Sequence, residues 1–269
     1  MSEDHVELYH EIHGEAGPWI TLVHGGLVPS PSWDRQVRDL SPNLTDVARV
    51  LTLDLRGYGQ SPPAPHGQGY DIATLAEDVR ALWDALGIER TTLVGFSMGG
   101  FVAQQLALEH PGRVAALVLV STATRLSSNA VAAFTARATE IEEYGLTHER
   151  DHHLANAFSA GFRERQPELL DDYARHIAAN RPGVVVSTFR VLGDFDRHDE
   201  LTAVGCPTLV ACGEQDPGLG PDSARELADA LETDDLIVFP EVGHTLQIEN
   251  ANSFNRQVLD FLARHEVIR

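Results

Sequence analysis

The sequence of 269 residues predicts an α/β fold: a mostly parallel, doubly wound sheet with an inserted helical lid. Short apolar runs alternate with helical stretches, which is typical of parallel strands that helices cover on both faces. The alternation stops between about residue 125 and residue 204, where helical patterns continue without a convincing strand, and it then resumes. We therefore assign residues 1–124 and 205–269 to the core and residues 125–204 to the lid.

Each element is justified by its own pattern. Residues 19–26 (WITLVHGG) form an apolar strand that ends in glycines, and residues 48–61 (ARVLTLDLRGYGQS) form a strand that runs into a turn. Residues 71–88 place apolar side chains at steps of three and four, which predicts an amphipathic helix. The remaining core segments alternate in the same way: strand 91–97, helix 101–108, strand 114–123, strand 206–216, helix 223–232, strand 234–244 and helix 252–265. Within the lid, residues 130–145 and 167–180 are the clearest helices.

The junction between strand 91–97 and helix 101–108 has almost no loop and carries a serine between two glycines. Gly95, Ser97 and Gly99 form a G-x-S-x-G pattern. A Cβ at either glycine would collide with the strand or the helix, so this cramped reversal requires glycine. The strained turn lifts the serine oxygen clear of the sheet, and Ser97 is therefore our candidate nucleophile.

A serine hydroxyl becomes a useful nucleophile only beside a base, which a third group must orient. His244 follows Gly243 where the last apolar strand ends, and Asp216 lies at the end of segment 206–216. Ligands of open parallel sheets bind at the carboxyl ends of the strands. The chain order serine, aspartate, histidine is also the order that this architecture uses. Glu214 is the alternative acid.

Attack by a serine on a carbonyl group creates a negative oxygen that backbone N–H groups can stabilise. Met98 directly follows the candidate nucleophile at the amino end of a helix, where the helix dipole favours negative charge. Gly26 ends the first core strand and is the second candidate donor, with Leu27 as the alternative. We interpret His24, in the same loop, as a ring that tethers the loop to nearby main chain.

Two other polar groups receive a structural interpretation. Asp54 and Arg56 lie where a strand turns away, so we expect them to brace that turn. His148, His152 and His153 in the lid lack the accompanying Cys or carboxylate spacing of a metal site, and we place them on a polar helix surface. We therefore predict no metal and no cofactor.

Charge and cysteine content limit the partners and the compartment. Twenty basic and 40 acidic residues give a net charge of −20, which argues against nucleic acid and anionic membranes, because both require a positive face. No apolar run approaches the roughly 18 residues of a membrane span, and the acidic amino-terminal stretch lacks a signal-peptide core. We expect a cytoplasmic protein.

Cys206 and Cys212 flank one strand, roughly 20 Å apart, which is too far for a disulfide.

The motifs HGG, DLRGYGQS, GFSMGG, GEQD and VGH together resemble the α/β-hydrolase fold superfamily over nearly the whole chain, least in the lid. DLRGYGQS and GIERTTLVGFSMGG are especially similar to small bacterial esterases, enol-lactonases, carbon–carbon bond hydrolases and cofactor-free haloperoxidases. The resemblance implies a triad of Ser97, Asp216 and His244, with an oxyanion hole formed by Gly26 and Met98. Haloalkane dehalogenases and epoxide hydrolases of this fold carry aspartate in place of the serine, so we do not expect those activities.

The function that this resemblance implies is hydrolysis of a small carboxylic ester or lactone through an acyl-enzyme. Carbon–carbon bond hydrolysis of a β-diketone or vinylogous ketone, perhydrolysis and acyl transfer use the same three side chains and remain alternatives. A non-catalytic small-molecule receptor on the same fold is an alternative of a different class. We expect a small-molecule substrate, and the sequence leaves the oligomeric state open between monomer and homodimer.

The lid is expected to shape the substrate pocket. Arg125, just after the strand that precedes the lid, is a candidate partner for a substrate carboxylate, with a solvated surface position as the alternative. Apolar lid residues suggest a cavity wall: Phe134, Leu154, Phe158, Phe162 and Phe189. Our substrate-binding candidates are Leu27, Arg125, Phe134 and Phe158.

Overall fold

The computed structural model describes residues 6–38, 44–64 and 69–268 and confirms the predicted fold class. One seven-stranded sheet has the strand order β1-β3-β2-β4-β5-β6-β7. β1 pairs antiparallel with β3, and the other strand pairs of this sheet are parallel. The strands are β1 (His10–His13), β2 (Trp19–Val23), β3 (Arg49–Leu53), β4 (Thr91–Phe96), β5 (Val114–Val120), β6 (Thr208–Gly213) and β7 (Leu236–Phe239).

Helices cover both faces of the sheet because alternate strand residues point to opposite sides. Leu93 of β4 packs in a cluster with apolar residues of α2, α3 and α9, whereas its neighbour Val94 packs with residues of α1 and α11. The core helices are α1 (Asp34–Val37), α2 (Ile72–Ala85), α3 (Met98–Glu109), α9 (Pro221–Ala230), α10 (Leu246–Glu249) and α11 (Ala251–Arg264). The sheet is therefore buried on both sides, as its continuous apolar strands require.

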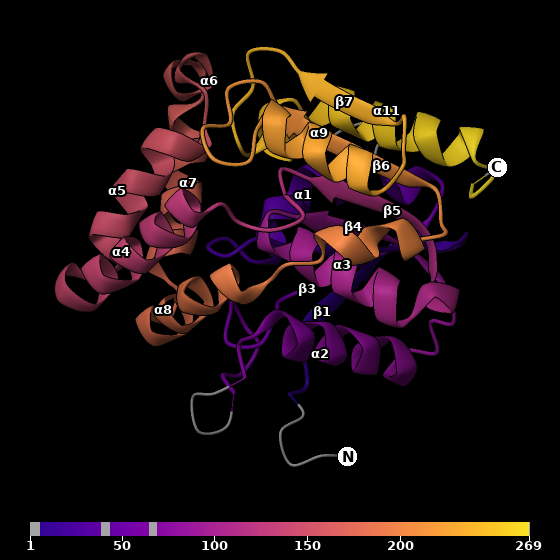
Figure 1. The fold of residues 1–269 in the computed structure, drawn as a ribbon, viewed down its shortest axis with the longest axis horizontal. Helices are drawn as coiled ribbons and strands as arrows, with labels where there is room; N and C mark the ends of the chain where they lie inside the picture. The colour runs from indigo at the N-terminus through magenta and orange to yellow at the C-terminus, as the bar shows by residue number, and fades with distance from the viewer. Residues whose placement is uncertain (1–5, 39–43, 65–68, 269) are drawn as a thin grey trace.

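The insert between β5 and β6 is helical, and its helices gather beside the sheet in Figure 1. We call α4 to α8 the lid helices: α4 (Ser128–Tyr144), α5 (Leu146–Ala157), α6 (Ala160–Arg165), α7 (Pro167–Ala178) and α8 (Pro182–Val191). Residues 121–207 are all described and contain no named strand. An isolated antiparallel bridge joins Arg125 to Asp196 and closes the base of the insert. Within the insert, α4 packs on α8 and α5 packs on α7.

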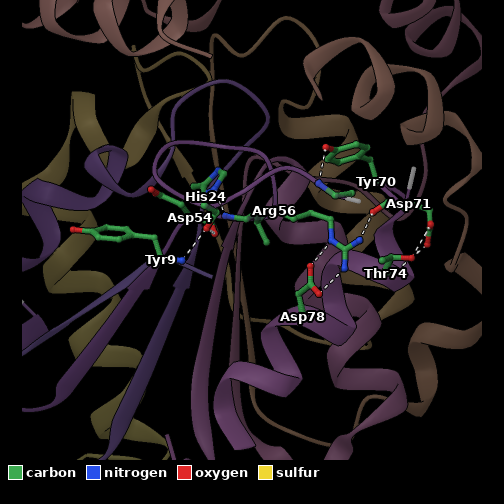
Figure 2. A network of polar contacts seen from close by, with 12 residues as sticks. Tyr9, His24, Asp54, Arg56, Tyr70, Asp71, Thr74 and Asp78 are labelled. Atoms are coloured by element: carbon green, nitrogen blue, oxygen red, sulfur yellow. Dashed lines mark hydrogen bonds and ion pairs between the residues drawn. The ribbon is translucent and has the colours of Figure 1, made fainter. Parts of the chain in front are cut away.

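The turn after β3 is braced by polar side chains, as the sequence predicted (Figure 2). Asp54 Oδ1 accepts the N–H of Ser30 at 2.8 Å, and Oδ2 accepts the N–H of Gln60 at 2.9 Å. Arg56 and Asp78 form an ion pair with side chains that are 3% and 2% exposed, and Arg56 Nη2 donates to Asp78 Oδ1 at 2.6 Å. These contacts fix the turn after β3 against α2. They also occupy the carboxylate and guanidinium groups that could otherwise have suggested an ion-binding site.

Neither cysteine takes part in a disulfide. Cys212 is buried within β6, and burial raises the pKa of its thiol to about 12. Burial also raises the pKa of the partly buried Cys206. Both thiols therefore stay protonated near neutral pH and act as small apolar side chains.

Two points bear on the predicted compartment. Among the described helices, none is long and apolar enough to cross a membrane. The first five residues of the acidic amino-terminal stretch lie outside the described residues. The prediction of a cytoplasmic location therefore remains a prediction.

Candidate active site

Ser97 lies at the sharp turn from β4 into α3, in a conformation that serine rarely adopts. Its φ of 52° and ψ of −116° lie outside the usual regions for a residue with a side chain. A Cβ built on Gly95 would lie 2.3 Å from the carbonyl oxygen of Gly99, and one on Gly99 would lie 2.2 Å from that of Val23. The two glycines thus allow strand and helix to approach closely enough to force this turn, as the sequence pattern predicted.

His244 and Asp216 meet at the carboxyl ends of β7 and β6. Nδ1 of His244 lies 2.6 Å from Oδ2 of Asp216, while Oδ1 of Asp216 accepts the N–H groups of Gly218 and Leu219, each at 3.0 Å. Burial alone would raise the pKa of Asp216, but His244 and the two N–H groups outweigh it and hold that pKa below its ordinary value. An ionised carboxylate therefore fixes the imidazole with Nδ1 toward Asp216.

Two alternatives considered from the sequence have other partners. Glu214 Oε2 accepts the N–H of Glu241 at 3.1 Å, so Asp216 is the carboxylate that bonds to the histidine. His24 is buried, and its Nε2 accepts the N–H of Leu55 at 2.9 Å while Nδ1 lies 2.6 Å from the carbonyl oxygen of Gly25. Both ring nitrogens of His24 are thus used to tether the loop, as predicted.

One cavity of about 420 Å³ brings the sequence-predicted residues together. Ser97, Asp216 and His244 all line it, as do Gly26 and Met98. Among the described residues, Ser97 Oγ makes no hydrogen bond, and catalytic hydrogen bonds of unliganded sites often form only with the substrate bound. The volume falls in the range of roughly 300–1,000 Å³ that is common for small-molecule sites.

Gly26 and Met98 border this cavity, and their backbone N–H groups have no acceptor among the residues that the structure describes. Met98 is the first residue of α3, and amides of a first helical turn have no partner within the helix. Gly26 follows β2, and a Cβ there would meet only Phe189 at 3.5 Å and the Met98 sulfur at 4.0 Å. Neither N–H donates to another residue in the described part of the chain. Both can donate to a negative oxygen that forms near Ser97.

A half-buried carboxylate joins the loop of His244 to the lid helices. Glu249 accepts hydrogen bonds from the N–H of Gly243 at 2.9 Å and from the hydroxyl of Ser159 at 2.5 Å. On the other side of the histidine, the N–H of Thr245 donates to the carbonyl oxygen of Ala157 at 3.1 Å. Both neighbours of His244 are therefore tied to the junction between α5 and α6. Thr245 bonds to Ala157 directly, and Gly243 is linked to Ser159 through the carboxylate of Glu249.

The apolar wall of the cavity contains only some of the predicted residues. Leu27, Phe134 and Phe189 line it, and the last two rings pack edge to face with centroids 5.0 Å apart. Phe158 does not line the cavity, which corrects our expectation. It is buried inside the lid, where its ring packs edge to face on Tyr173 at 4.9 Å. Leu154 and Phe162 are likewise absent from the lining.

Arg125 is also not part of the cavity lining, and its predicted contact with substrate is corrected. Its side chain is 45% exposed and lies 3.2 Å from Glu226 and 3.5 Å from Asp196. The bridge to Asp196 turns this residue to the outside of the base of the lid. The solvated position that the sequence left open as the alternative is the one observed.

The lid histidines divide between the surface and the cavity. His148 and His152 are exposed, as predicted, and Nε2 of His148 lies 3.4 Å from Glu140. His152 also lines the cavity, and so does the half-buried His153, whose predicted position on a polar surface is corrected. Arg137 lines the cavity as well and was not predicted. The sequence signal that could have placed His153 on the inner face was the spacing in α5. Residues 146, 149 and 157 are buried and share a helix face with residue 153.

Comparison with known proteins identifies the class. The family model described as the alpha/beta hydrolase fold matches residues 18–251, so the chain belongs to this family. A protein named "Putative carbamate hydrolase RutD" from Variovorax paradoxus is 35% identical over 96% of this chain and 96% of its own length. The 3-oxoadipate enol-lactonase 2 of Acinetobacter baylyi is 32% identical over 78% of this chain and 76% of its own. The crystal structure of an enol-lactonase from Burkholderia xenovorans has a TM-score of 0.87 at 31% identity, covering 96% of this chain and 97% of that one.

These relatives are hydrolases by name, and the chain is accordingly assigned to the hydrolases of this fold. They differ in the bond that their names specify. The names also include 2-hydroxy-6-oxononadienedioate/2-hydroxy-6-oxononatrienedioate hydrolase of Paraburkholderia xenovorans, at 28% identity over 96% of this chain and 91% of that protein. The substrate of this chain must therefore be argued from its own site.

Proposed function

We propose that the protein is a serine hydrolase that cleaves a small carboxylic ester or lactone through an acyl-enzyme. The observation that carries the proposal is the arrangement of Ser97 in a strained turn on the same cavity as a histidine that an ionised aspartate holds. In this proposal Ser97 is the nucleophile, His244 is the general base and Asp216 orients it. Gly26 and Met98 supply the oxyanion hole.

The proposed reaction proceeds in two similar halves. His244 Nε2 takes the proton of Ser97 as Oγ bonds to the acyl carbon, and the N–H groups of Gly26 and Met98 stabilise the negative oxygen. The bond to the leaving alkoxide then breaks, and the alcohol leaves with the proton from the imidazolium. Water attacks the acyl-enzyme with the same base, which releases the acid and restores Ser97. Asp216 stabilises the imidazolium in both halves because its carboxylate stays ionised.

The cavity supports a small acyl group rather than a polymer or a long chain. Its volume is about 420 Å³, and its lining combines apolar side chains such as Leu27, Phe134 and Phe189 with a few polar groups. That composition suits a small molecule whose reacting carbonyl is fixed by a limited number of donors. The enol-lactonase names among the relatives agree with the lactone part of the proposal.

The test combines covalent labelling with a substrate screen. A fluorophosphonate probe is expected to label wild-type protein at Ser97, located by peptide mass spectrometry, and to leave Ser97→Ala unlabelled. The purified protein is then assayed on short- and long-chain p-nitrophenyl esters, lactones, carbamates and β-diketones. Fast turnover of short esters or lactones is the expected result, with no turnover by Ser97→Ala at an unchanged circular dichroism spectrum.

The same experiment separates the competing functions. Preferred turnover of β-diketones would replace the ester or lactone by a carbon–carbon bond as the scissile bond, and preferred transfer to added alcohol or peroxide would make the protein an acyltransferase or perhydrolase. A folded protein that is neither labelled nor active on any compound would contradict the enzyme proposal. It would instead favour a small-molecule receptor on this fold.

A further inference from the structure

Arg137 of α4 borders the cavity and is held in one orientation by its neighbours. Its Nε and Nη2 donate to the two carboxylate oxygens of Glu149, with Nε at 3.1 Å from Oε2. The guanidinium carbon also lies 5.0 Å from the ring centroid of Phe134 and 4.7 Å from that of Phe189. These contacts leave Nη1, which donates to no residue that the structure describes. Arg137 thus presents a fixed hydrogen-bond donor in the lid.

The positive charge of this donor is already balanced. The side chain of Glu149 is 2% exposed and that of Arg137 is 17% exposed, so the pair is largely removed from water. A two-point contact between a guanidinium and a carboxylate fixes the geometry of both groups. Together the two side chains have no net charge, although the N–H groups of Nη1 keep their polarity.

His153 supplies a second donor on the same cavity. Its ring is stacked parallel to Tyr173, with centroids 5.8 Å apart and planes 4° from parallel, and Nε2 lies 3.5 Å from the Tyr173 hydroxyl. Burial lowers the pKa of His153 well below its ordinary value, and the charges of Arg137 and His244 act in the same direction. The ring is therefore neutral near pH 7 and carries one N–H.

The hydroxyl contact allows the proton of the neutral His153 ring to lie on Nδ1. When Nε2 accepts the hydrogen of the Tyr173 hydroxyl, the single proton of the neutral ring is on Nδ1. Nδ1 makes no hydrogen bond within the described part of the chain. Arg137 is on α4 and His153 is on α5, two lid helices that pack against each other, and both residues line the same cavity. His244 lines this cavity as well.

We propose that Arg137 and His153 form a second binding subsite, which takes an uncharged oxygen acceptor of the substrate remote from the bond that is cleaved. A ketone, ester or amide carbonyl oxygen has two lone pairs and accepts two hydrogen bonds, which matches the two donors. The inference rests on the proposed function, because it places the far end of the substrate at Arg137 and His153 while the carbonyl group that reacts lies at Ser97. The substrate class is thereby narrowed to acyl compounds with a second, neutral oxygen function.

Electrostatics favours a neutral acceptor over a carboxylate. A carboxylate that leaves water needs a full positive charge to offset the loss of hydration. Here the Arg137 charge is already paired with Glu149, His153 is neutral, and Asp216 adds a further negative charge to the cavity. A second carboxylate at Arg137 would face the first one across the same guanidinium. A neutral carbonyl gains the two hydrogen bonds without that repulsion.

The test measures binding of three matched ligands to protein with Ser97→Ala, so that turnover does not interfere. Methyl hexanoate, methyl 5-oxohexanoate and monomethyl glutarate have acyl main chains with the same number of non-hydrogen atoms, because a carboxylate oxygen of glutarate takes the place of the terminal methyl group. They differ only at the far end: alkyl, ketone and carboxylate. Their Kd values are measured by ligand-observed NMR titration. The result for each protein is the Kd of the alkyl ester divided by that of the ketone ester.

Three variants are compared in that background. His153→Phe keeps a ring against Tyr173 but removes the donor. Arg137→Met with Glu149→Gln removes the second donor without leaving a buried charge. The control is Arg190→Met with Glu142→Gln, which makes the same two changes in an exposed ion pair of the same lid.

The ketone preference is expected to fall about threefold to tenfold in His153→Phe, as the loss of one hydrogen bond implies, and further in the Arg137 and Glu149 variant. The Arg190 and Glu142 control is expected to keep it. An unchanged ratio in His153→Phe, which should fold because ring size is preserved, overturns the subsite. Tightest binding of monomethyl glutarate, lost in the same variants, overturns the neutral class. Ester turnover with Ser97 intact is assayed separately, and its absence counts against the proposed function alone.

Discussion

The residues at the carboxyl ends of the strands and the lid helices both line the cavity, but their side chains are held in place by different means. At the carboxyl ends of the strands the backbone fixes Ser97. Gly95 lets β4 approach α3, and Gly99 lets α3 approach the end of β2, within distances that exclude a Cβ. In the lid, side chains fix one another, as Arg137 and Glu149 do through two hydrogen bonds. The proposed nucleophile thus depends on main-chain geometry, and the far wall of the cavity depends on pairs of side chains.

This difference teaches that reactivity and selectivity can change independently in this fold. A substitution in the lid can alter which molecule fits while the turn at Ser97 stays as it is. A substitution at the turn disturbs the proposed nucleophile, Ser97, whatever the lid contains. The four predictions below test this division, beginning with the largest expected effect.

Replacing the acid at the carboxyl end of β6 should have the largest effect on activity. Asp216→Asn removes the negative charge that stabilises the imidazolium of His244 and allows the wrong tautomer, so we expect kcat to fall about 10³- to 10⁴-fold. Steady-state kinetics on the best ester measures the loss, with Glu214→Gln as the control that should stay within about twofold. A variant that retains a tenth of the wild-type kcat would contradict the role of Asp216.

Two glycine substitutions compare the regions directly. In Gly99→Ala the new Cβ would lie 2.2 Å from the carbonyl oxygen of Val23, so we expect a loss of about 1–3 kcal/mol in the free energy of unfolding, together with reduced kcat. In Gly183→Ala of α8 the Cβ meets nothing within 4 Å, and helix propensity favours alanine by up to about 1 kcal/mol. Urea unfolding measures both. Equal effects at the two positions would refute the contrast.

Glu249 lies between the two regions, and its effect should depend on pH. Burial raises its pKa despite the hydrogen bonds from Ser159 and Gly243. The folded protein therefore binds this proton more tightly than the unfolded chain does. The contribution to stability is fully present below the unfolded pKa and is lost as pH rises through the folded pKa.

The free energy of unfolding of wild type minus that of Glu249→Gln should accordingly decrease as pH rises from about 4 to 8. Urea unfolding of both proteins across this range measures the trend. Glu241→Gln is the matched control, since Glu241 is an exposed carboxylate in the same loop. A difference that grows with pH would show that the carboxylate is stabilised as an anion at this position.

The smallest effect is expected at the outer base of the lid. Arg125→Ala removes two exposed ion pairs, to Asp196 and Glu226, which are together worth less than about 1 kcal/mol. We expect kcat/KM to stay within about twofold because the side chain lies outside the cavity lining. A tenfold rise in KM for an anionic ester would restore the contact with substrate that the sequence suggested.

The same difference explains what the sequence could predict. Glycine spacing, apolar runs and strand ends are local patterns, and they located Ser97, Asp216 and His244 on one cavity. β1 was not predicted, because the segment HEIH is short and mostly polar and gives no apolar run. Its strand conformation depends on pairing with β3, about 40 residues further along the chain.

The lid was harder to predict because its helices have no single inward face that composition reveals. α5 is polar on most of its surface, so His153 looked solvated, although it shares a face with the buried Leu146 and Glu149. Phe158 was assigned to the cavity wall for being aromatic, but its partners are other rings inside the lid. Which aromatic side chain meets the cavity depends on how α5 and α7 pack, and that information is not local.

The hydrogen bonds that join the His244 loop to the lid restrict how lids can be exchanged between relatives. A chimera that replaces residues 125–204 as one block would discard the acceptor for Thr245 at Ala157 and the donor to Glu249 at Ser159. Its histidine would lose support, and activity would disappear before any new specificity was visible. Grafts that retain residues 157–159 of the host, and replace the helices on either side, keep the hydrogen bonds that hold the loop of His244 in its position on the cavity.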